Sequence, residues 1–340
     1  MISWDAVRTI AVALASRTEN RAAGDFDYPR AVERVLPPLS EFTGIQLPRD
    51  LHHRRQLRVA DRAEWIDFNI EGFGAIMEPV LKRAAAGADN LTWALGGVTL
   101  TAQVGLLLGF LSARVLGQYD TGPLLIRNRS EGPGKVFFLD GNIVSAAGRL
   151  GVPVDGLRIW IVLHEMTHAL QFEGYPWLRN HLGELLEGFM APLADRLGVR
   201  ETLRRLSDNL RSGGRSVELM MTRPQREAFD GMQAAMSVIE GYSDYVMHNV
   251  GRGLVPDYER LSRRMARSRA HRPPLETAIF RITGLDMKLE QYRLGERFAE
   301  AVARRRGMEG LNRVWERPEN LPTLEEVRDP GLWMSRMEGA

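Results

Sequence analysis

Residues 163–170 read Leu163-His-Glu-Met-Thr-His-Ala-Leu170, and this stretch decides how the chain is interpreted. On a helix, His164 and His168 lie one above the other on a single face, so both imidazoles can reach the same metal ion. Glu165 is offset by one position, which directs its carboxylate at a water molecule held by the metal rather than at the metal. The pattern therefore predicts Glu165 as the catalytic general base and Zn²⁺ as the cofactor.

The flanking sequence predicts a long, buried helix around this motif. Asp155 is a suitable N-cap, and Gly174 and Pro176 mark the end of the helix. Between these positions nearly every face carries apolar residues, which is typical of a helix inside a core. Polar histidines in such a helix need partners, because unpaired buried polar groups are costly. The setting favours a metal site over a coincidence of residues.

Catalytic zinc takes three protein ligands and keeps one position open, so a third ligand must come from elsewhere in the chain. The metzincin extension requires glycine and histidine at two later positions, which here hold Gln171 and Gly174, so that pattern fails. Acidic residues and a histidine closer to the motif are rival ligands, namely Glu173, His181, Glu184 and Glu187.

Glu240 is the predicted third ligand, on a second long helix expected over about residues 225–250 and closed by Gly251. Asp244 lies one turn later on the same face, and we expect it to bind the outer nitrogen of a ligating histidine. None of the rival ligands has an aspartate one turn later on a long helix, which favours Glu240.

Amide hydrolysis also requires a group that stabilises the oxyanion. His248, two turns beyond Glu240 on the same face, and Tyr242 are possible electrophiles. For these two a packing or surface role is the favoured alternative, and the same holds for Tyr245, Tyr292 and Arg293.

Two short β-forming runs precede the motif. Pro123–Ile126 and Lys135–Leu139 are separated by a loop-like stretch and predict a hairpin or two neighbouring strands. The expected fold class is α+β and predominantly helical, with a small β-sheet beside the helix of the motif. We expect Lys135–Leu139 to form the edge of the cleft, where an extended peptide substrate pairs with its backbone. A small amide or ester is the alternative substrate.

The composition restricts the site and the cellular setting. The chain has 340 residues and no cysteine, which excludes disulfides, thiol nucleophiles and cysteine-ligated metals. Basic and acidic residues nearly balance, and the net charge of +2 is too small to argue for nucleic acid, so no nucleic-acid partner is expected. Asp5 and Arg8 interrupt the N-terminal pattern that a signal peptide would need, which favours a cytoplasmic protein.

One uncharged stretch, Leu91–Ala113, is long enough to span a bilayer and contains the close-packing pair Gly105 and Gly109. Its polar residues favour a helix buried on all sides in a large soluble protein, so no membrane partner is expected. The chain is expected to form one compact unit with an N-terminal helical region at 1–116, a metal-binding core at 117–255 and a C-terminal helical region at 256–340. The oligomeric state stays open.

The quoted motifs resemble those of the uncharacterised zinc-dependent metalloproteases, or hydrolases, of actinobacteria and related bacteria. The resemblance lies in His164–Phe172, Pro176–Arg179 and Glu240–Asp244, and it extends to Arg114–Asp120 and Gly284–Phe298. Some members of that family are linked to biosynthesis of a deazaflavin cofactor. The Glu-x-x-Ser-Asp spelling of residues 240–244 is also similar to the third-ligand motif of gluzincins. The resemblance implies a zincin-like fold and hydrolase activity, and it names no substrate.

Two classes of function are compatible with these residues. The first is a zinc metallohydrolase, in particular a metallopeptidase, and the second is a binding or scaffold protein with a structural or vestigial zinc site. Glu165 favours the first class, because a purely structural site has no use for a general base.

Overall fold

Helices dominate the fold. The computed structural model describes residues 2–16, 25–46, 56–85, 90–120, 134–196, 221–270 and 287–339. The elements are α1 (Trp4–Ala15), α2 (Tyr28–Thr43), β1 (Gln56–Val59), α4 (Arg62–Ala85), α5 (Asn90–Ser112), β2 (Gly117–Asp120), β3 (Lys135–Phe138), α6 (Asp140–Leu150), α7 (Val154–Gly174), α8 (Trp177–Arg196), α11 (Arg223–Leu254), α12 (Tyr258–Ala270), α14 (Met287–Asn312), η1 (Arg313–Trp315), η2 (Pro318–Asn320), α15 (Leu324–Arg328) and α16 (Pro330–Glu338). A small sheet beside many helices confirms the predicted α+β class.

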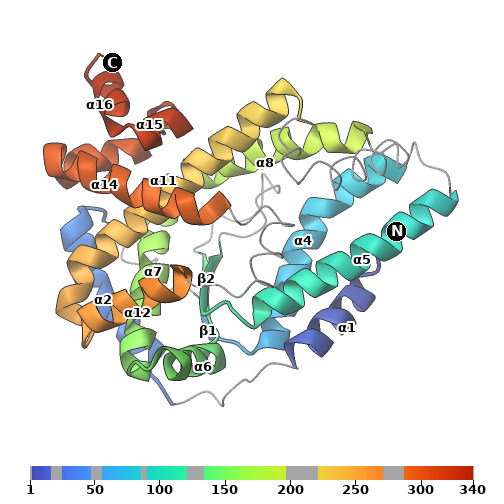
Figure 1. Cartoon of the computed structure of the whole chain (residues 1–340), viewed down its shortest axis with the longest axis horizontal. Helices are drawn as coiled ribbons and strands as arrows, with labels where there is room; N and C mark the ends of the chain where they lie inside the picture. Colours follow the sequence, from blue (N-terminus) through green and yellow to red (C-terminus); the bar gives the residue numbers. More distant parts are fainter. Residues whose placement is uncertain are drawn as a thin grey trace.

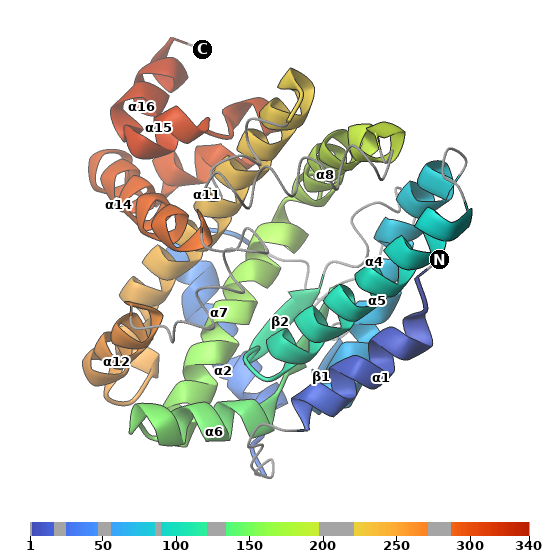
Figure 2. The ribbon, with the colours of Figure 1, turned by 45° about the vertical axis from the view of Figure 1, so that its right-hand side comes forward.

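The sheet has the strand order β1-β3-β2, with β1 parallel and β2 antiparallel to β3. The run Lys135–Leu139 does form a strand, but that strand is central and pairs on both sides. Its prediction as the edge of the cleft is therefore wrong. The edge beside α7 belongs to β2, as Figure 2 shows. The other run predicted as a strand, residues 123–126, lies outside the described residues.

The sheet separates two apolar cores. Because side chains alternate along a strand, Val136 and Phe138 of β3 enter the larger core, which includes α2, α7, α11 and α14. Phe137 and Leu139 enter the smaller core with α1, α4 and α5. Figure 1 shows the same division, with α1, α4 and α5 on one side of the strands and α7 on the other. The helix of the motif is thus covered by the larger core on most of its surface.

A buried ion pair fixes the start of α7. Arg158 donates to both carboxylate oxygens of Asp140 at 2.8 Å, and the Tyr28 hydroxyl donates to the same carboxylate at 2.5 Å. These contacts join α7 to α6 and α2. The N-cap of α7 is Pro153 rather than Asp155, because the helix begins at Val154 and Asp155 uses its carboxylate to pair with Arg158.

The uncharged helix α5 is buried on one face only, which corrects the expectation that it is buried on all sides. Gly105 and Gly109 lie against α1 so closely that a Cβ on Gly109 would come within 2.7 Å of the Ala11 carbonyl oxygen. On the outer face, Val98 is 69% exposed and Leu106 is 53% exposed. In the described part of the chain, no helix is long and apolar enough to cross a membrane.

The second long helix, α11, crosses α14 at a pair of glycines. A Cβ on Gly241 would lie 2.0 Å from the carbonyl carbon of Gly295, so the two backbones touch. At the start of α11, Thr222 and Gln225 form a capping box. Gly251 does not close the helix as predicted, because its missing side chain instead makes room for the Tyr258 ring, and α11 continues to Leu254.

Candidate metal centre

The helical spacing of α7 brings its two histidines together. The Nε2 atoms of His164 and His168 lie 3.2 Å apart, and the two rings are nearly perpendicular at 80°. His168 is buried, and His164 is partly exposed. The two imidazoles therefore lie together on one face of α7, as predicted.

Glu240 reaches the same point from α11, which packs against α7. Its Oε2 atom lies 3.9 Å from His164 Nε2 and 3.7 Å from His168 Nε2. Within the described residues, these three side chains form the group of histidine and carboxylate atoms that could hold a metal ion. The rival residues Glu173, His181, Glu184 and Glu187 are not part of it.

The donor set fits zinc. Two imidazole nitrogens and one carboxylate oxygen are ligands that catalytic zinc takes, and three protein ligands leave one position open. Bonds of the usual length in a tetrahedral site place neighbouring ligand atoms about 3.4 Å apart. The observed separations of 3.2, 3.7 and 3.9 Å differ from that value by a few tenths of an ångström. Small side-chain adjustments would therefore complete the site.

Glu165 lies beside this group and is 4% exposed. The pKa of its carboxyl is raised to about 7, mainly by burial and to a smaller extent by the charge of Glu240, whereas His168 and the Tyr119 backbone N–H oppose the shift. The contact with Tyr119 ties the carboxylate to β2. Gly117 permits this approach, because a Cβ there would come within 2.7 Å of Glu165 Oε1.

The pairing of β2 explains why Tyr119 is the residue that reaches Glu165. The Leu139 N–H donates to the Leu116 carbonyl, so in this antiparallel ladder the peptide groups of residues 116, 118 and 120 face β3. The groups of Gly117 and Tyr119 consequently point the other way, toward α7. The strand β2 was not predicted from the sequence, because Gly-Gln-Tyr-Asp has no β-forming run.

The outer imidazole nitrogens have partners that were not predicted from the sequence. His168 Nδ1 lies 2.9 Å from Gln171 Oε1, and Gln171 Nε2 donates to the Ile239 carbonyl at 3.0 Å. His164 Nδ1 lies 3.2 Å from Met247 Sδ and 3.4 Å from Ser243 Oγ. Asp244 directly follows Ser243 on α11, and its predicted contact with a ligating histidine stays a prediction.

The possible electrophiles make other contacts. The Tyr242 hydroxyl donates to Asn312 at 2.9 Å, its ring is fully buried against Trp315, and burial raises its pKa well above 10. His248 Nε2 lies 3.0 Å from Arg252 Nη2. These contacts explain both residues by packing, and a role in oxyanion stabilisation stays a prediction. The side chains of Tyr292 and Arg293 lie outside the described residues.

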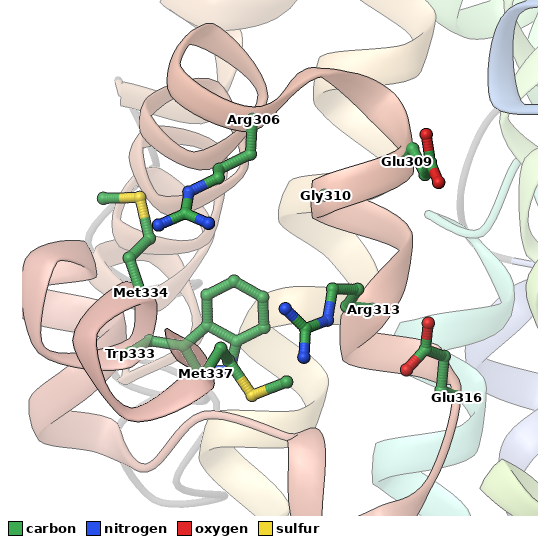
Figure 3. Close-up of a pocket in the computed structure, with 8 residues that line it drawn as sticks. All are labelled: Arg306, Glu309, Gly310, Arg313, Glu316, Trp333, Met334 and Met337. Atoms are coloured by element: carbon green, nitrogen blue, oxygen red, sulfur yellow. The ribbon is translucent and has the colours of Figure 1, made fainter. Parts of the chain in front are cut away.

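A separate cavity of about 240 Å³ lies in the C-terminal part of the fold. Figure 3 shows the guanidinium groups of Arg306 and Arg313 near the Trp333 ring, while the carboxylates of Glu309 and Glu316 turn away from it. Arg306 forms an ion pair with Glu338. No residue of the metal centre lines this cavity, so it is not part of the candidate site. Its lining consists of Arg306, Glu309, Gly310, Arg313, Glu316, Trp333, Met334 and Met337.

Comparison with known proteins identifies the family. The model of a family described as zincin-like metallopeptidase matches residues 2–334, nearly the whole chain. The chain belongs to this family. The resemblance found in the sequence is thereby confirmed at the level of the zincin-like metallopeptidases, and its actinobacterial and deazaflavin links stay expectations.

A solved structure supports the same class of protein. The chain is similar to a protein from Chloroflexus aurantiacus described as a candidate hydrolase with a novel fold. The two share 35% identity over 99% of each chain, with a TM-score of 0.73. No curated protein matches the chain. Membership of the zincin-like metallopeptidases and this structural similarity both support a hydrolase.

Proposed function

We propose that the chain is a zinc-dependent hydrolase that cleaves peptide bonds, with Glu165 as its general base. The observation that carries the proposal is the place of Glu165. A buried carboxylate lies beside two histidines and a glutamate that fit zinc, and a backbone N–H of the edge strand binds it. A purely structural zinc site is closed by four protein ligands and needs no such carboxylate.

His164 Nε2, His168 Nε2 and Glu240 Oε2 would hold the ion. When bound, zinc supplies Lewis acidity, which polarises the scissile carbonyl and makes an attacking water acidic. Glu165 accepts the proton of that water and delivers it to the nitrogen of the leaving amine. The Tyr119 N–H keeps the Glu165 carboxylate oriented during both transfers.

The edge strand β2 supports a peptide as the substrate. Like β1, β2 pairs with one strand only among the described strands, and β2 is the edge strand beside α7. Its Tyr119 N–H already binds Glu165, so a peptide would pair with other backbone groups of this edge. An extended peptide that lies along this edge gains backbone hydrogen bonds with little demand on its sequence. The central strand β3 cannot serve in this way, since both of its neighbours are strands. A small amide or ester would need no such edge.

Two measurements test the proposal. Elemental analysis of protein expressed with added zinc should find about one zinc per chain. Incubation with a diverse peptide library should yield cleavage by the native protein and none by Glu165→Gln, which should keep its zinc because the carboxylate is not a ligand. Glu173→Gln is the matched control. It removes another carboxylate of α7, which accepts a hydrogen bond from the Tyr119 hydroxyl.

Other results would point to the alternatives. Zinc-loaded protein that cleaves small amides or esters but no peptide would remove the peptidase assignment. Zinc-loaded protein without any hydrolysis would favour a binding or scaffold role. Loss of zinc in Glu165→Gln would show that this carboxylate is a ligand rather than the base.

A further inference from the structure

Gln171 is the residue that connects the two helices of the metal centre. It lies on α7 three positions after His168, and its side chain is completely buried. Its amide oxygen contacts His168 Nδ1 at 2.9 Å, and its amide nitrogen contacts the carbonyl oxygen of Ile239 on α11 at 3.0 Å. Ile239 directly precedes Glu240. One side chain therefore touches one predicted ligand and the peptide group next to another.

Hydrogen-bond chemistry fixes the direction of this chain of contacts. The Ile239 carbonyl can only accept, so the amide nitrogen of Gln171 must face it as donor. The amide oxygen of Gln171 then faces His168 and can only accept. His168 Nδ1 must consequently carry the proton, and its Nε2 atom presents a lone pair toward His164 and Glu240.

The burial of Gln171 makes this arrangement costly to change. A buried amide that loses either partner leaves an unsatisfied polar group, which is unfavourable. Rotation of the imidazole or a shift of α11 would break one of the two hydrogen bonds. These two hydrogen bonds hold His168 and the backbone beside Glu240 in the positions that bring both ligands to the candidate metal site.

We infer that Gln171 is a positioning residue that holds His168 in its Nδ1-protonated tautomer and holds the backbone beside Glu240, so that both ligands are preorganised for zinc. The inference rests on the proposed function for the identity of the metal. Loss of this residue should weaken zinc binding on the order of ten- to a hundredfold, as changes to residues that orient metal ligands do.

The first test uses the native protein without metal. Nitrogen-15 chemical shifts of the imidazole rings in chelator-treated protein report the tautomer of each neutral histidine. We expect His168 protonated on Nδ1. A native protein with His168 protonated on Nε2 would overturn the inference, whatever its zinc content or activity.

The second test uses two substitutions. Gln171→Met keeps the shape of the side chain and removes both hydrogen bonds, so we expect a mixture of His168 tautomers and zinc binding weaker on the order of ten- to a hundredfold by chelator competition. Gln171→Glu keeps an acceptor for His168 and removes the donor to Ile239. We expect His168 in Gln171→Glu to keep its proton on Nδ1. This variant tests the contact with His168 apart from the contact with Ile239, and it does so even if Gln171→Met folds poorly.

Gln225→Met is the matched control. Gln225 is also a buried glutamine that joins two helices, since it caps α11 and donates to the Phe189 carbonyl of α8. It touches no histidine, so its loss should lower stability and leave the His168 tautomer and zinc affinity unchanged. Native zinc binding with equal affinity in Gln171→Met and Gln225→Met would contradict the inference and leave the proposed function intact. Failure of the native protein to bind zinc would contradict the proposed function instead.

Discussion

Replacement of Glu165 by glutamine should stabilise the metal-free protein at neutral and alkaline pH. The cause is the burial that raises the pKa of this carboxyl from 4.5 to about 7. A carboxyl whose pKa is higher in the folded than in the unfolded protein favours folding while it is protonated. That contribution is complete below pH 4.5 and is lost as the pH rises through about 7.

The magnitude follows from the two pKa values. One pKa unit corresponds to about 1.4 kcal/mol, so the difference between the folded and unfolded pKa values of this carboxyl lowers the free energy of unfolding by about 3 kcal/mol at pH 8 and by about 1 kcal/mol at pH 5. Glutamine keeps the size of the side chain and cannot ionise. Its amide oxygen can still accept from the Tyr119 N–H, so the contact with β2 is retained.

Urea unfolding of chelator-treated protein at several pH values measures the effect. The stability difference between Glu165→Gln and the native protein should grow between pH 5 and pH 8 by about 2 kcal/mol. The matched control Glu173→Gln should give no comparable growth, because this carboxylate is only partly buried and binds the Tyr119 hydroxyl. A difference independent of pH, or a less stable Glu165→Gln at pH 8, would refute the reasoning.

Further expectations concern the ligands and the contact with β2. Glu240→Ala should weaken zinc binding far more than Glu184→Ala, whose side chain is exposed on α8, and equal zinc retention would exclude Glu240 as a ligand. Asp244→Ala should weaken zinc binding on the order of ten- to a hundredfold by chelator competition, if it orients a histidine. Gly117→Ala places a Cβ within 2.7 Å of the Glu165 carboxylate, the proposed base, and should reduce both kcat/KM and stability, the latter by about 1–3 kcal/mol. Gly72→Ala, where a Cβ meets nothing within 4 Å, is the control that should reduce neither.

The sequence predicts the α7 part of the site well, because that part is local. Two histidines four positions apart fall on one face of any helix, whatever the rest of the chain does. Glu240 could be predicted for a related reason, since its spacing from Asp244 also describes a helix face. The contact of Gln171 with His168 could have been predicted in the same way, because residues three positions apart lie on the same side of a helix. The second contact of Gln171, with Ile239, depends on the packing of α7 against α11 and has no local signal.

The sheet was harder to predict because strand order is a long-range property. β1 reads Gln-Leu-Arg-Val and alternates polar and apolar residues over four positions only, whereas β2 reads Gly-Gln-Tyr-Asp and has no such alternation. The hydrophobic strand β3 is recognisable, but its central position depends on partners far away in the sequence. The exposed face of α5 was also not predicted. A helix without charges gives no indication of which side meets solvent.

The contact between Gly241 and Gly295 extends the requirements of the metal centre into the C-terminal third of the chain. Glu240 directly precedes Gly241, where the backbones of α11 and α14 touch. A larger side chain at either glycine would force the two helices apart and draw the carboxylate of Glu240 away from the histidines. A truncation ahead of α14 would remove the same support. Damage to the metal site can thus originate in residues that are not among its three ligands.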